Sequence, residues 1–108
     1  MSLEIKKLNT DQGDYELVLS GVLDISTRST FDEVFDSLVD LQSLKLNLEE
    51  LEFIDSTGVG GIMEIIFASN ERGFQLTVLN INDNIEEILS TLGVFTIMES
   101  LQVERCST

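Results

Sequence analysis

Residues suited to chemistry are concentrated in one segment of the sequence, DSTGVGG at positions 55–61. Ser56 and Thr57 place two hydroxyl groups at the expected start of a helix, where free backbone N–H groups and the helix dipole favour negative charge. Three glycines follow, and each costs a helix about 1 kcal/mol relative to alanine. The segment therefore has two compatible interpretations. It is an ordinary helix cap, or it is a helix start that accepts an anion or lies very close to another backbone.

The amino-acid composition excludes most catalytic uses of this segment. The chain has no histidine, which removes Ser-His-Asp triads, Cys-His dyads and histidine-ligated zinc. No lysine follows Lys45, so a nucleotide-binding P-loop and a phospho-aspartate receiver both lack the cation they need. A nucleophilic serine would need a base beside it, and residues 80–87 lack the spacing of an EF-hand. We expect no enzyme activity, no cofactor and no metal site.

The charge of the chain narrows its possible partners. Twenty acidic residues face six basic ones, giving a net charge of −14 over 108 residues. Such a surface repels nucleic-acid phosphates and anionic membranes, so we expect neither as a partner. The single cysteine, Cys106, cannot form an internal disulfide, which fits a reducing, cytoplasmic compartment, and we expect an inert thiol. The sequence shows neither a signal peptide nor an apolar stretch of the roughly 20 residues that span a bilayer.

Hydrophobic periodicity and turn residues predict the elements that position the segment. The predicted strands are 3–8, 15–19, 44–48, 75–80 and 95–98, and the predicted helices are 26–41, 56–71 and 83–92. Residues 49–54 are expected to form an acidic loop, and the tail 99–108 a weak helical turn or a frayed end. Capping-box spacing occurs at Thr30 with Glu33, and at 83 with 86 or 84 with 87. In the helix 56–71, the side chains expected to face inward are Val59, Ile62, Met63, Ile66 and Phe67, and Gly73 is expected to end it in a left-handed conformation.

This order, ββαβαβαβ, predicts an α/β fold with helices packed on a single mixed β-sheet. Strands that alternate with helices imply crossover units and mostly parallel pairing. The opening hairpin makes the sheet mixed. The length fits one domain over residues 1–108, with its core at about 3–98.

Three stretches taken together resemble the STAS domain, in particular the free-standing bacterial anti-sigma factor antagonists. They are GVLD at 21–24, LNL at 46–48 and FIDSTGVG at 53–60, and the element order matches over about residues 3–98. The resemblance implies that the first hydroxyl residue after the aspartate, here Ser56, is phosphorylated by a serine kinase that is itself the anti-sigma factor. The unphosphorylated antagonist binds that kinase and releases the sigma factor, and a serine phosphatase restores it.

The resemblance also implies a kinase-facing surface. It places Asp24, Asp55, Thr57 and Gly58 there, and the glycine cluster adds Gly60 if these glycines allow close approach by a partner. On that hypothesis, Gly58 and Gly60 matter more for binding than for folding. Only the resemblance favours Ser56 over Thr57 as the modified residue. Two alternatives stay open: a STAS subunit of a transport or stress-signalling assembly, and a sensor that binds a small anion at this helix start.

Binding to a kinase partner should be assisted by electrostatic attraction, because the chain is strongly acidic and Glu49, Glu50, Glu52 and Asp55 precede the helix. Salt screens such attraction over about 10 Å at 0.1 M. We expect the association rate to fall as salt rises, with a smaller change in the dissociation rate. Stopped-flow measurement across a salt series tests this, and an association rate that does not change with salt would contradict it.

Overall fold

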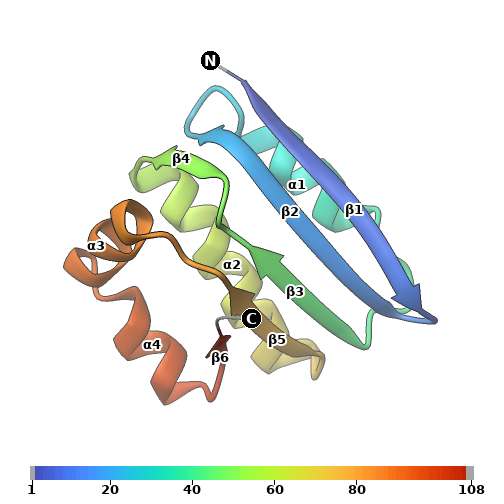
Figure 1. Cartoon of the computed structure of the whole chain (residues 1–108). Coiled ribbons are helices and arrows are strands. Elements are labelled where there is room, and N and C mark those ends of the chain that lie inside the picture. The colour runs from blue at the N-terminus through green and yellow to red at the C-terminus, as the bar shows by residue number, and fades with distance from the viewer. Residues whose placement is uncertain (1, 107–108) are drawn as a thin grey trace.

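The computed structural model describes residues 2–106, which form one six-stranded sheet and four helices (Figure 1). The strands are β1 (Leu3–Asp11), β2 (Asp14–Leu23), β3 (Ser43–Asn47), β4 (Leu51–Ile54), β5 (Gln75–Leu79) and β6 (Glu104–Cys106). The helices are α1 (Arg28–Asp36), α2 (Ser56–Arg72), α3 (Asp83–Thr91) and α4 (Val94–Ser100).

The sheet has the order β1-β2-β3-β5-β6, and β4 also pairs with β2. The hairpin pair β1 and β2 is antiparallel, whereas the other pairs are parallel, which confirms the predicted mixed, mostly parallel sheet. The long strand β2 serves two partners in turn. Residues 14–18 pair with β3, and residues 21–23 pair with β4. The sheet can therefore continue past the end of β3, and β4 ends beside the end of β2.

One face of the sheet forms the core because alternate strand residues are apolar. Its side chains are buried against the helices, and α1 and α2 lie behind the sheet in Figure 1. The core residues from the central strands are Leu17, Leu19, Leu44, Leu46, Leu76 and Val78. The face toward the viewer carries no helix among residues 2–106, and Glu16, Lys45 and Thr77 are neighbours there across three strands. Polar residues are suited to this open face.

Helix α2 matches its predicted range closely. Gly73 follows it with a φ of 82°, the left-handed conformation predicted for this glycine. Val59, Ile62 and Ile66 are buried as expected, and Met63 packs partly buried against the core. The expectation for Phe67 is wrong, because this side chain is 49% exposed. The buried stripe continues through Ile65 and Ser69 instead, which turns Phe67 toward solvent.

The chain departs from the predicted elements in its short segments. Residues 51–54 form β4 rather than a loop, because the last part of β2 offers a free edge for pairing. Helix α1 covers only 28–36 of the predicted 26–41. The predicted strand 95–98 lies inside α4, where Val94 and Met98 are buried one helical turn apart. A short apolar run does not distinguish these two structures by periodicity.

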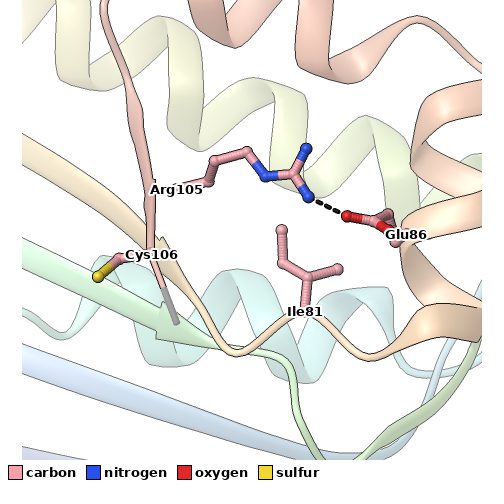
Figure 2. Close-up of a pocket in the computed structure, with 4 residues that line it drawn as sticks. All are labelled: Ile81, Glu86, Arg105 and Cys106. Carbon is pink, nitrogen blue, oxygen red and sulfur yellow. Dashed lines mark hydrogen bonds and ion pairs between the residues drawn. The ribbon is translucent and has the colours of Figure 1, made fainter. Parts of the chain in front are cut away.

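The predicted tail contains the rest of α4 and the last strand, β6, which pairs in parallel with β5. Residues 107 and 108 of that tail lie outside the described residues. Arg105 anchors β6, because its guanidinium forms an ion pair with Glu86 of α3 and lies 3.9 Å from the ring centre of Phe95. Figure 2 shows Arg105 reaching Glu86 above Ile81. Cys106 is a free, exposed thiol.

Asn82 caps α3 and ties it to the β3–β4 connection, a role that the predicted capping boxes at 83 and 84 missed. Its side-chain oxygen accepts a hydrogen bond from the backbone N–H of Ile85 at 3.0 Å. Its amide nitrogen lies 3.0 Å from the carbonyl of Leu48, 3.1 Å from that of Glu49 and 2.8 Å from that of Leu51. One side chain therefore fixes the turn that leads into β4.

The substitution Asn82→Asp should destabilise the protein by about 2–3 kcal/mol, because it leaves three carbonyls without their donor and sets a carboxylate against them. Urea unfolding at neutral pH measures this. The matched control is Asn84→Asp, which removes a single hydrogen bond to the Glu52 carbonyl and adds a charge that the helix start favours. Equal losses for the two variants would contradict the role assigned to Asn82.

Candidate functional site

The parallel pairing of β2 with β4 brings Asp24 and Asp55 to the same edge of the sheet. Leu23 is paired with Ile54, so the residues that follow the two strands start beside each other. The backbone N–H of Asp55 donates to the Leu23 carbonyl at 3.3 Å, and the N–H of Ile25 donates to Asp55 Oδ2 at 3.3 Å. The ends of β2 and β4 are far apart along the chain, but hydrogen bonds join them into one local structure.

Asp55 is the N-cap of α2. Its backbone is extended, and its Oδ1 accepts a hydrogen bond from the N–H of Gly58 at 2.8 Å. Ser56 is the first helical residue and its side chain is exposed, whereas Thr57 is half-buried. Among residues 2–106, no group forms a hydrogen bond with the Ser56 hydroxyl. The site therefore presents an accessible, unengaged hydroxyl at a capped helix start.

Asp24 organises the loop between β2 and α1. Its Oδ1 accepts hydrogen bonds from the hydroxyl of Ser26 at 2.6 Å and from the N–H of Ser26 at 2.9 Å. The buried hydroxyl of Thr27 accepts from the N–H of Asp24 and donates to the Val22 carbonyl. The Ser26 hydroxyl holds the pKa of Asp24 below its usual value, although partial desolvation acts in the opposite direction. Asp24 is therefore a fixed negative charge beside Asp55 at neutral pH.

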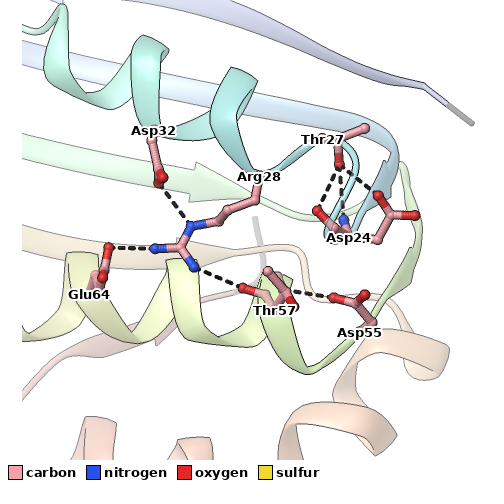
Figure 3. A network of polar contacts seen from close by, with 8 residues as sticks. Asp24, Thr27, Arg28, Asp32, Asp55, Thr57 and Glu64 are labelled. Carbon is pink, nitrogen blue, oxygen red and sulfur yellow. Dashed lines mark hydrogen bonds and ion pairs between the residues drawn. The ribbon is translucent and has the colours of Figure 1, made fainter.

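Arg28 joins α1 to α2, and Figure 3 shows its guanidinium between the two helices. Its Nε donates to Asp32 at 3.0 Å, and its Nη2 donates to Glu64 at 2.6 Å. Its Nη1 donates to the backbone carbonyl of Thr57 at 3.1 Å, one residue beyond Ser56. The hydrogen bond to Asp32, and then that to Glu64, raises the pKa of Arg28 above its usual value. Sequence reasoning missed Arg28, although its spacing of four residues from Asp32 is a typical ion-pair signal.

The three glycines of α2 differ in how much space surrounds them for a side chain. A Cβ at the buried Gly58 would lie 2.3 Å from the Leu23 carbonyl oxygen and 2.8 Å from Cγ1 of Ile54. A Cβ at Gly61 would lie 3.0 Å from Arg28, and one at Gly60 would be in ordinary contact with Arg28 at 3.5 Å. The close approach that Gly58 allows is to the chain's own β2, so this glycine is needed for internal packing, whatever it contributes to binding.

Exposed apolar surface lies beside these polar groups. Ile25, between Asp24 and Ser26, is 77% exposed, the largest exposure among the large apolar side chains of the described residues. Its backbone N–H is bound to Asp55, so this side chain is held next to the start of α2. A single exposed apolar residue is common. The sequence pattern did not indicate that Ile25 lies in the loop next to the start of α2.

Comparison with known proteins agrees with this geometry. Residues 6–105 match the family model of the STAS domain, and the chain belongs to this family. Along residues 2–106, none of the helices has the length and apolar character needed to cross a membrane.

Individual relatives are regulatory antagonists. The anti-sigma-B factor antagonist of Staphylococcus aureus is 28% identical over 109 residues, which cover 96% of this chain and 100% of the relative. Among solved structures, a Thermotoga maritima protein assigned as an anti-sigma factor antagonist has a TM-score of 0.79 at 23% identity, covering 96% of this chain and 86% of that one. The Bacillus cell fate determinant SpoIIAA in its phosphorylated form has a TM-score of 0.66 at 16% identity, covering 97% and 91%. The resemblance to the STAS domain drawn from the sequence is confirmed.

The glycines give a direct test of the packing at this site. Gly58→Ala should destabilise the protein by about 1–3 kcal/mol, because its Cβ collides with the Leu23 carbonyl. Gly60→Ala should leave stability unchanged or raise it by up to about 1 kcal/mol, because the site has room and alanine favours a helix. Thermal and urea unfolding of both variants measure the difference. A stable Gly58→Ala variant would return that glycine to a role in binding.

Proposed function

We propose that this protein is an anti-sigma factor antagonist that binds an anti-sigma factor serine kinase and is switched off by phosphorylation at Ser56. The observation that carries the proposal is the exposed, unengaged Ser56 hydroxyl at the capped start of α2, at the sheet edge where Asp24 and Asp55 follow the paired ends of β2 and β4. Membership of the STAS family and the similarity to antagonists support it.

The surroundings of the two hydroxyl residues favour Ser56 over Thr57. A kinase must place the acceptor oxygen in its own active site, so the acceptor needs an exposed side chain. Ser56 is exposed, whereas Thr57 is half-buried and its carbonyl is bound to Arg28. The same exposure would let a serine phosphatase reach phosphorylated Ser56 and restore the antagonist. The kinase and the phosphatase would place the protein in the cytoplasm, where ATP is available.

The proposed kinase-facing surface consists of Asp24, Asp55, Ser56, Thr57 and Gly60, with Gly58 beneath it. Asp55 and Gly58 set the position of the helix start, since one caps it and the other lets it approach β2. Gly60 has no side chain, so nothing projects from α2 at this position and a partner could approach the helix closely there. The exposed Ile25 supplies an apolar contact beside the acidic pair. A partner with basic groups around an apolar hollow would fit this surface.

Phosphorylation would act as a charge switch. A phosphate adds roughly −1.5 to −2 charges at pH 7, and the helix start tolerates it because its N–H groups and dipole favour anions. The modified protein should therefore stay folded. The added charge accumulates beside Asp24 and Asp55 on the surface that docks, and desolvating it costs affinity. A penalty of about 3 kcal/mol would weaken binding about 150-fold.

Titration of an anti-sigma factor kinase from the same genome tests the switch. We expect phosphorylated protein to bind on the order of 100-fold more weakly than unmodified protein while its circular dichroism is unchanged. Ser56→Ala should bind but accept no phosphate, Ser56→Asp should fold and bind poorly, and Thr57→Ala should still be phosphorylated. Equal affinities of the two forms, or undiminished phosphorylation of Ser56→Ala, would refute the proposal. Loss of structure on phosphorylation would refute the charge mechanism alone.

A further inference from the structure

Arg28 is the cation that the described residues hold against the first two turns of α2. Its Nη1 lies 3.1 Å from the Thr57 carbonyl oxygen and 3.5 Å from where a Cβ at Gly60 would stand. Ser56 precedes Gly60 by four residues, so both lie on the same side of the helix. Gly60 and Gly61 carry no side chains, which leaves room for Arg28 beside this part of α2, and a Cβ at Gly61 would lie 3.0 Å from its Nε. Figure 3 shows the guanidinium facing this end of the helix.

A phosphate attached to Ser56 could reach the guanidinium of Arg28. Side chains four residues apart on a helix have Cβ atoms about 5–6 Å apart. A phosphoserine extends beyond its Cβ by the Oγ–P and P–O bonds, and the arginine side chain is long and flexible. A small rotation of both side chains would bring a phosphate oxygen and the guanidinium into hydrogen-bonding distance.

The present partners of Arg28 would compete poorly with a phosphate. The Glu64 side chain is 71% exposed and that of Asp32 is 43% exposed, so both carboxylates stay well hydrated when released. Exposed ion pairs of this kind contribute little to stability. A phosphate dianion carries more charge than either carboxylate and matches the planar guanidinium with two parallel hydrogen bonds. Asp24 and Asp55 follow the paired ends of β2 and β4, next to the start of α2, so Arg28 is also the cation that would relieve the repulsion between these carboxylates and a phosphate on Ser56.

We propose that Arg28 binds the phosphate of phosphorylated Ser56 and leaves Glu64 and Asp32 when it does so. This inference rests on the proposed function. Its consequence is that phosphorylation changes two places at once. It adds charge at the start of α2, and it frees two carboxylates along the groove between α1 and α2, which Asp32, Asp36 and Glu64 line around an apolar floor of Phe35, Ile65 and Ala68. The phosphorylated state would then differ from a simple Ser56→Asp variant, whose shorter side chain does not reach Arg28.

The test uses the full chain with phosphoserine incorporated at position 56 by genetic code expansion, so it needs no kinase. We measure the phosphoserine titration by ³¹P NMR and the Arg28 Nε–H signal by ¹⁵N NMR. A guanidinium contact favours the dianion, so Arg28→Gln should raise the phosphoserine pKa by about half a unit or more. The matched control is Arg72→Gln, the same charge change about 24 Å along α2. Arg28→Lys should give a smaller rise than Arg28→Gln.

A second variant keeps the test independent of any loss of stability in Arg28→Gln. Glu64→Gln removes the competing carboxylate and should lower the phosphoserine pKa, and this effect should shrink when Arg28→Gln is also present. Equal titrations in wild type, Arg28→Gln and Arg72→Gln would overturn the inference, as would an Arg28 Nε–H signal that phosphate leaves unmoved. A kinase that fails to bind the protein would refute the proposed function instead, and the two failures are separate measurements.

Discussion

Leu23 and Ile54 pair in parallel, and this pairing sets the position of every group at the candidate site. It places the Leu23 carbonyl against the start of α2, where only a glycine at position 58 fits. It also sets Asp55 where one carboxylate oxygen caps α2 and the other binds the Ile25 N–H of the neighbouring loop. Ser56 follows this cap directly as the first residue of α2, and its side chain is exposed.

The site combines a rigid frame with an exchangeable cation. Backbone pairing, the Asp55 cap and the Asp24–Thr27 hydrogen bonds are local and satisfied, so an added charge at Ser56 need not disturb them. Arg28 is different, because it bridges two helices through exposed carboxylates that water can solvate equally well. A surface built this way can change its electrostatic character while the fold stays the same. That property suits the proposed phosphorylation switch at Ser56.

Sequence periodicity predicted the long elements and the mixed, mostly parallel sheet, because a regular apolar pattern has only one way to bury its stripe. It failed for short segments. The run at 95–98 is helical, because Val94 and Met98 are then buried in the core one turn apart. The acidic residues around 51–54 led to the prediction of a loop, whereas this segment forms a strand on the free edge of β2. The predicted cap of α3 was also misplaced by one or two residues. Asn82 is the cap because its side chain also binds three backbone carbonyls that lie more than thirty residues earlier in the chain.

For the candidate site, the sequence by itself determined the capped helix start, the two hydroxyls, the acidic charge and the absence of histidine, because these depend only on residue type and local spacing. The tertiary structure alone decided which hydroxyl is exposed, that Gly58 serves internal packing and that Arg28 binds the Thr57 carbonyl, one residue beyond Ser56. These facts depend on contacts between residues about thirty positions apart, and such contacts arise only when the sheet brings the ends of β2 and β4 together.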